Sequence, residues 1–184
     1  GSRGMVWLEP LIEVEDASGQ RIAYGPVTAD DVPGLVQAGL FDAAPHRLRL
    51  GRVEDMPWFA QQERLTFARV GVIDPVSAHG GYAGLQRALG MTGSEVVHEV
   101  LESGLRGRGG AAFPTGIKWR TVLEQHSPQK YVVCNADEGD SGTFSDRMLM
   151  EGDPLCLIEG MLIAGLAVGA TRGYIYLRCE YPHA

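Results

Sequence analysis

The second half of the chain alternates helix signals with strand signals, and this order constrains the fold more than any other feature of the sequence. Residues 92–95 form a capping box that starts an amphipathic helix, and residues 118–125 can form a second helix. Residues 130–134 predict a buried strand, and Pro154 opens a long apolar helix. Residues 172–177 predict the next strand. Such an order is typical of an α/β fold with a parallel sheet, whose ligands bind at the carboxyl ends of the strands.

The segment before residue 92 gives weaker signals. Residues 11–15 and 20–24 predict the two strands of a hairpin, and residues 28–39 predict a helix with a capping box at its start. No hydrophobic period holds for long between residues 41 and 91. We therefore expect a linker there that wraps over the following domain, with a short helix at residues 82–89.

The composition excludes several classes of protein. The chain has 16 basic and 23 acidic residues among 184, a net charge of −7, which argues against a protein that coats nucleic acid. Its three cysteines form no CxxC pair, so no zinc or iron–sulfur site is expected within the chain. The apolar run at residues 155–170 is too short for a membrane span, which needs about 20 residues. With no apolar leader in residues 1–10, we expect a cytoplasmic protein without direct membrane contact.

A glycine-rich loop, residues 104–116, separates two predicted helices. Its central glycines allow positive φ and close approach of a ligand to the backbone: Gly107, Gly109 and Gly110. Amides ahead of a helix N-terminus bind anions, and three basic side chains add positive charge: Arg106, Arg108 and Lys118. The loop therefore suits nucleotide phosphates, although it fits neither the P-loop nor the Rossmann fingerprint. A flexible linker is the alternative, and an RNA-binding segment is disfavoured in an acidic chain.

Two further polar segments follow the predicted strands. The acidic loop, residues 135–142, contains four polar side chains: Asn135, Asp137, Glu138 and Asp140. Carboxylates accept hydrogen bonds from ribose hydroxyls, as they do in dinucleotide sites. A solvated acidic turn and a magnesium or calcium site are the alternatives. The strand-end turn, residues 178–181, follows the second strand. It either lies near the same ligand or is simply the exposed end of that strand.

These loops together resemble a known family. Residues 104–119, 134–138 and 174–181 are similar, in order, to three blocks of the FMN- and NADH-binding flavoprotein subunit of respiratory complex I. The resemblance covers residues 60–184. The family includes the diaphorase subunits of NAD-dependent formate dehydrogenases and NAD-reducing hydrogenases. Residues 4–35 resemble a thioredoxin-like module of that diaphorase branch, and the ending of the chain is similar to it too, so we favour the beta subunit of a molybdenum-dependent formate dehydrogenase.

The resemblance implies a domain organisation, cofactors and partners. Residues 1–40 would be the end of a thioredoxin-like module, 41–91 the linker, and 92–184 the incomplete, N-terminal part of a Rossmann-like FMN/NADH-binding domain. The cofactors would be FMN and NAD, with a [4Fe–4S] cluster in a C-terminal part that the chain does not contain. The partners would be a small, ferredoxin-like iron–sulfur gamma subunit and a molybdenum-containing alpha subunit.

The resemblance also implies roles for individual residues. FMN would be bound by Gly107, Arg108, Gly109, Lys118, Asn135, Asp137, Glu138, Tyr176 and Glu180. NAD would be bound by Gly109, Gly110, Ala111, Phe113, Lys118, Asp140 and Glu180. No catalytic acid or base and no metal ligand is expected, because a hydride passes directly between the two bound rings. One departure stands inside the glycine-rich loop, where Ala112 replaces the usual glycine.

Other functions are compatible with the same residues. Within the family, the chain could belong to an NAD-reducing hydrogenase or to complex I. From another class, it could be a nucleotide-binding module without redox function, or a fragment that only scaffolds its partners. Bound flavin would distinguish the diaphorase from both the nucleotide-binding module and the scaffolding fragment.

Overall fold

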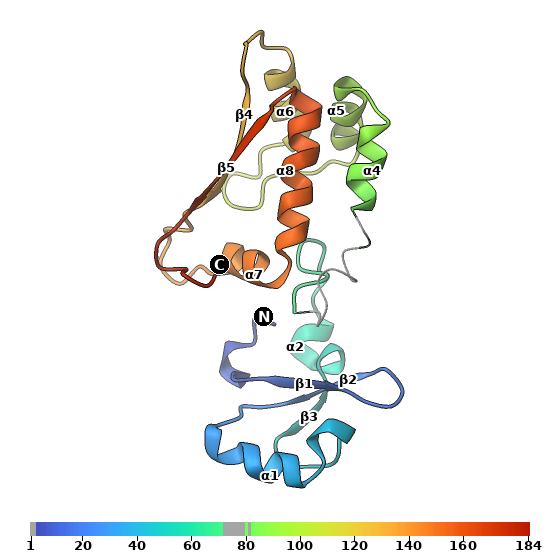
Figure 1. Ribbon diagram of the computed structural model, residues 1–184, viewed down its shortest axis with the longest axis vertical. Helices are drawn as coiled ribbons and strands as arrows, with labels where there is room; N and C mark the ends of the chain where they lie inside the picture. Colours follow the sequence, from blue (N-terminus) through green and yellow to red (C-terminus); the bar gives the residue numbers. More distant parts are fainter. Residues whose placement is uncertain (1–2, 72–79, 81) are drawn as a thin grey trace. The chain divides into compact units, whose positions relative to one another are not determined.

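The computed structural model describes residues 3–71, 80 and 82–184. It divides into two compact units, one of Ser2–Ala68 and one that runs from Arg69 to Ala184 (Figure 1). The boundary lies inside the segment that we expected to be a linker. Part of that segment, residues 72–79 and 81, lies outside the described residues. The assignment of a thioredoxin-like module, a linker and an FMN/NADH-binding domain stays a prediction.

The first unit contains a three-stranded antiparallel sheet in the order β1 (Ile12–Glu15), β2 (Arg21–Tyr24) and β3 (Arg49–Arg52). The predicted hairpin of β1 and β2 is confirmed. Its turn is closed by Asp16, whose Oδ1 accepts hydrogen bonds from the amides of residues 18 and 20. The strand β3 was not predicted, because a four-residue segment with two arginines and a glycine has no clear alternation.

The predicted helix at residues 28–39 is present as a 3₁₀ turn, η2 (Ala29–Asp31), followed by α1 (Val32–Gln37). Its capping box is confirmed, since the amide and hydroxyl of Thr28 donate to the Asp31 carboxylate at 2.9 and 2.6 Å. Leu35 of α1 and Tyr24 of β2 belong to one buried cluster on the sheet. The remaining short elements of this unit are η1 (Val6–Leu8), η3 (Leu40–Asp42), η4 (Val53–Asp55) and α2 (Pro57–Ala60).

The second unit has the predicted α/β order. Its elements are α4 (Ala83–Leu89), α5 (Gly93–Glu102), α6 (Thr115–Leu123), β4 (Tyr131–Ala136), α7 (Ser145–Gly152), α8 (Pro154–Val168) and β5 (Arg172–Leu177). The strands β4 and β5 pair in parallel, from Tyr131 opposite Arg172 to Ala136 opposite Leu177. The expected α/β fold with a parallel sheet is therefore confirmed. No helix among the described residues is long and apolar enough to cross a membrane.

The expectation of a buried strand at residues 130–134 is wrong. Tyr131 and Val133 are 49% and 62% exposed, and every residue of β5 is exposed. Alternate residues of a strand point to opposite faces of the sheet. The helix α8 lies along one face (Figure 1) and contacts both strands, while the face that carries Tyr131 and Val133 stays open.

The core of the second unit lies where α4, α5 and α8 meet. Its buried members are Ala88, Val96, Val97, Ala167 and Val168. The capping box that starts α5 is confirmed, with Thr92 and Glu95 bonded to each other. The helix α6 then packs closely on α5, because Gly116 is buried and a Cβ there would lie 2.6 Å from Leu101 Cγ. This contact fixes α6, and with it the C-terminal end of the glycine-rich loop.

Candidate functional site

A cavity of about 690 Å³ lies between the glycine-rich loop, the start of α6 and the carboxyl end of β4. The loop and helix side contributes Gly107, Gly109, Gly110, Ala111, Ala112, Phe113, Thr115, Lys118 and Trp119. The strand side contributes Val133, Asn135, Asp137, Glu138, Gly139, Asp140 and Asp146. Its position at a strand end is the one expected for the ligand of a parallel sheet.

The glycine-rich loop is closed at its base like a hairpin. The amide of Gly107 donates to the carbonyl of Phe113 over 3.0 Å, and the amide of Thr115 donates to the carbonyl of Leu105 over 2.9 Å. The guanidinium of Arg106 also donates to the carbonyl of Ala112 at 2.7 Å. Arg106 therefore uses its Nε donor within the loop, and these three hydrogen bonds close the base of the loop as a turn.

The expected positive φ values are found at other positions of the loop. Gly107, Gly109 and Gly110 do not adopt them, whereas Gly104 has φ of 67° and Ala112 has φ of 54°. An alanine in this region is strained, because its Cβ approaches the following carbonyl. Gly109 and Gly110 instead have open space where a Cβ would be, so a ligand can contact their backbone.

One wall of the cavity carries the groups that suit an anion and a flat ring. Lys118 lies in the first turns of α6 and lines the cavity. Phe113 is 53% exposed and lines the cavity on the same side. Trp119 also lines the cavity but was not predicted, because an aromatic residue inside a helix is most often part of the core.

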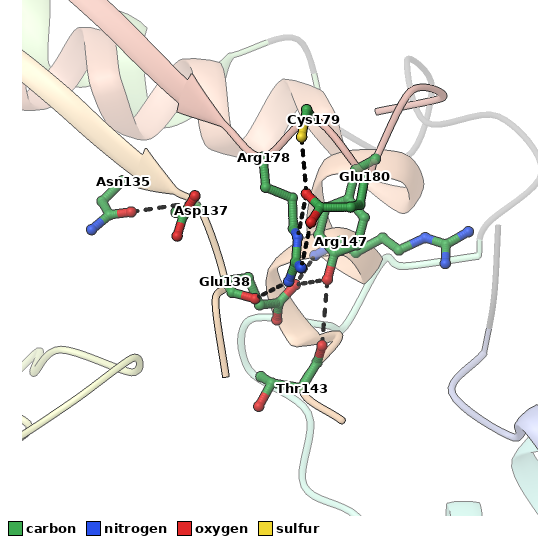
Figure 2. A network of polar contacts seen from close by, with 9 residues as sticks. Asn135, Asp137, Glu138, Thr143, Arg147, Arg178, Cys179 and Glu180 are labelled. Carbon is green, nitrogen blue, oxygen red and sulfur yellow. Dashed lines mark hydrogen bonds and ion pairs between the residues drawn. The ribbon is translucent and has the colours of Figure 1, made fainter. Parts of the chain in front are cut away.

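The other wall is built from the acidic loop. Asn135 accepts a hydrogen bond from the amide of Asp137 at 3.1 Å, which turns the chain at the end of β4. The carboxylate of Glu138 accepts from the amides of Asp146 and Arg147 at 2.8 and 3.1 Å. Burial raises the pKa of Glu138, but the hydrogen bonds from these two amides, Tyr181 and Ser145 together outweigh burial and hold the pKa below the usual value. Figure 2 shows Glu138 between Thr143 and Arg178, away from the Asn135–Asp137 pair.

The N-terminus of α7 is therefore already occupied. A helix N-terminus attracts anions through its free amides and dipole, and here the Glu138 carboxylate fills that position. An anionic ligand of the cavity would be placed instead against the glycine-rich loop and Lys118. The groups that we expected to bind phosphate and the groups that we expected to bind ribose hydroxyls thus lie on two separate walls of the cavity.

Asp146 was not predicted as a site residue, yet it lines the cavity from the first turn of α7. Burial, and then the neighbouring charge of Glu138, raise its pKa above the usual value. The signal that could have found it is its place at the start of the helix that follows the acidic loop. It adds a further carboxyl group to the wall that already holds Asp137 and Asp140.

Three predicted site residues lie outside the lining of the cavity: Arg108, Tyr176 and Glu180. Tyr176 is nevertheless directly opposite Asn135 in the β4–β5 register, so both point to the same face of the sheet. Glu180 is 60% exposed and pairs with Arg178 at 3.1 Å. Hydrogen bonds from Arg178, and then from Cys179, lower the pKa of Glu180 to about 2. The other predicted residues all line the cavity, and the role of each one stays a prediction.

The described residues contain no cluster of three or more His, Cys, Asp or Glu side chains that could hold a metal ion.

Residues 100–184, which include every lining residue of the cavity, match a protein family described as the Nuo51 FMN-binding domain. This part of the chain is therefore similar to that family, over somewhat less than half of the chain. The match agrees with the resemblance read from the glycine-rich loop, the acidic loop and the strand-end turn.

The proteins to which the chain is similar include subunits of hydrogenases and of NADH-quinone oxidoreductases. The chain is 54% identical over 129 residues to the NADP-reducing hydrogenase protein HndC of Solidesulfovibrio fructosivorans, covering 67% of this chain and 26% of that protein. It is 50% identical over 114 residues to an NADH-quinone oxidoreductase subunit of Aquifex aeolicus, covering 62% and 26%. It is 48% identical over 97 residues to the alpha subunit of the NAD-reducing hydrogenase HoxS of Cupriavidus necator, covering 53% and 16%.

A solved structure agrees with these relatives. The chain superimposes on an NAD⁺-reducing [NiFe]-hydrogenase in its H₂-reduced state with a TM-score of 0.51 and 31% identity, over 88% of this chain and 27% of that chain. The chain thus spans about a quarter of the length of the first relatives that it matches.

Proposed function

We propose that the chain is the FMN- and NADH-binding part of a diaphorase subunit. The observation that carries this proposal is the cavity, which lies within the Nuo51-type region and has one wall of loop amides and one wall of carboxylates. The names of the relatives support NAD(P)(H) as the second nucleotide. The chemistry that FMN supplies is hydride exchange with NAD(H) and single-electron exchange with iron–sulfur clusters.

The residues of the cavity fit the two nucleotides. A volume of about 690 Å³ is within the range of small-molecule sites, which is roughly 300–1,000 Å³. Lys118 and the amides at Gly109 and Gly110 would bind phosphate, and Phe113 would stack on a ring. Asn135 and Asp137 would accept hydrogen bonds from hydroxyl or ring N–H groups. These residues bind and orient, and none of them needs to transfer a proton.

Within this family we propose the beta subunit of a soluble, cytoplasmic formate dehydrogenase. The support is the resemblance of residues 4–35 and of the chain ending to that branch. Its partners would be a ferredoxin-like gamma subunit and a molybdenum-containing alpha subunit, with a [4Fe–4S] cluster elsewhere in the same protein. The 54% identity to a hydrogenase subunit favours a hydrogenase as the second candidate.

The test is an anaerobic absorbance spectrum of the complex that is purified through a tag on this chain. We expect a flavin band that bleaches when NADH is added. If formate bleaches the band in place of NADH, the formate dehydrogenase assignment is supported, whereas bleaching by hydrogen gas alone would replace it with a hydrogenase. A colourless complex that NADH still protects against thermal unfolding would contradict the flavin assignment.

A further inference from the structure

The Glu138 carboxylate has no acceptor capacity left for a ligand. It accepts four hydrogen bonds: from Ser145 Oγ at 3.2 Å, the Asp146 amide at 2.8 Å, the Arg147 amide at 3.1 Å and Tyr181 Oη at 2.9 Å. An ionised carboxylate offers about four lone-pair sites. Its side chain is thus fully used in joining the acidic loop to the start of α7 and to the strand-end turn.

The backbone of Glu138 is held by the same turn. Its carbonyl accepts a hydrogen bond from Nη1 of Arg178, whose other nitrogens bind the carboxylate of Glu180 (Figure 2). Glu138 has φ of 41°, a conformation that is strained for a residue with a Cβ. Such strain persists only where the surroundings over-determine the backbone, and both the side chain and the carbonyl of Glu138 are fixed here.

The residues on either side of Glu138 face the cavity. Asp137 precedes it, Gly139 follows it, and both line, together with Glu138 itself, the wall that the acidic loop forms. Any change in the backbone at Glu138 therefore moves this wall. Arg178 and Tyr181, by contrast, are not lining residues. These are the two residues of the strand-end turn that bind Glu138.

We propose that Glu138 is a positioning residue, through which Tyr181 and Arg178 set the shape of the acidic wall, and not a direct ligand of FMN. This inference rests on the proposed function for its ligand, because it concerns how the FMN site is shaped. It differs from the role that the resemblance implies, in which Glu138 contacts FMN itself.

Two variants and a control test the proposal in the full chain. Glu138→Gln removes the charge that binds the α7 amides, and Tyr181→Phe removes a single hydroxyl outside the cavity. Tyr174→Phe is the matched control, because Tyr174 is an exposed residue of β5 outside the cavity lining. The first readout needs no ligand: amide hydrogen exchange across residues 137–147. We expect faster exchange in Glu138→Gln and Tyr181→Phe, and unchanged exchange in Tyr174→Phe.

The second readout is the dissociation constant of FMN, measured by quenching of its fluorescence. We expect each of the two variants to weaken FMN binding about tenfold, and the double variant to bind no more weakly than Glu138→Gln alone. Weaker binding in Glu138→Gln with unchanged binding in Tyr181→Phe would establish a direct contact and overturn the proposal. So would unchanged exchange in both variants. If the purified complex that contains the wild-type chain holds no FMN, the proposed function fails, and the exchange experiment still decides whether Glu138 positions the loop.

Discussion

Arg69 donates from Nε to Asp153 Oδ2 over 2.8 Å, and the same Asp153 carboxylate caps α8. The other oxygen of this carboxylate, Oδ1, accepts a hydrogen bond from the amide of Cys156 at 3.2 Å. The Asp153 side chain is only 2% exposed, so these partners replace the water that it loses on folding. Because α8 covers one face of the β4–β5 sheet, this contact helps to fix the scaffold of the cavity.

Asp153→Ala should lower the free energy of unfolding by about 2–3 kcal/mol, because it removes both a helix cap and the partner of Arg69. The measurement is urea unfolding followed by circular dichroism. Glu99→Ala is the control, since it removes an exposed ion pair with Arg87 and should cost less than about 1 kcal/mol. Equal losses in the two variants would show that burial of Asp153 contributes nothing.

Two glycines of the glycine-rich loop should respond to alanine in different ways. Gly116→Ala introduces a Cβ that would lie 2.7 Å from the backbone nitrogen of Leu101, so it should destabilise the second unit by about 3 kcal/mol or more. Gly110→Ala meets open space and should leave stability unchanged. It should nevertheless weaken FMN or NADH binding severalfold, because a methyl group then stands where the ligand approaches. Thermal unfolding and ligand titration separate the two effects, and a stable Gly116→Ala variant would refute the predicted clash.

Lys118→Ala should weaken FMN binding about tenfold through loss of a cation that lines the cavity. Arg120→Ala on the same helix is the charge-matched control, because Arg120 is exposed and does not line the cavity. Fluorescence titration at low and high salt measures both variants. Equal losses in the two would indicate a general effect of charge rather than a contact with phosphate.

The ion pair of Glu180 with Arg178 predicts a pH dependence. A carboxyl group whose pKa falls to about 2 on folding stabilises the folded state above its unfolded pKa, near 4.5, and loses this effect as the pH falls toward 2. The difference in unfolding midpoint between wild type and Glu180→Gln should therefore be constant from about pH 7 to 5 and shrink between about pH 4.5 and 2. A difference that persists at pH 2 would contradict this ion-pair origin.

The sequence predicted the elements whose signals are local. The capping boxes at Thr28 and Thr92, and the proline at the start of α8, depend on residues within one turn and were confirmed. The exposure of β4 could not be predicted, because it depends on which elements cover each face of the sheet. The strand β3 was missed for a similar reason, since its place is set by pairing with β2.

In the candidate site, too, local features could be predicted from the sequence and contacts between distant residues could not. The glycine-rich loop and the acidic loop were recognised as chemistry-bearing segments, and the structure brings most of their predicted residues to one cavity. The use of Arg106 and Glu138 within the protein itself could not be predicted. Arg106 binds the carbonyl of Ala112, a contact that depends on the backbone geometry of the loop. Glu138 binds Tyr181, a contact that joins the segments after two different strands.

The exposure of β5 has a practical consequence for the isolated chain. All six residues of the strand are exposed, and among the described residues it pairs only with β4, so its outer edge presents unpaired amides and carbonyls. The strand is also rich in β-branched and aromatic side chains, which favour pairing with a second copy. The chain should therefore self-associate as its concentration rises, and light scattering across a dilution series should define the range in which binding constants refer to single molecules.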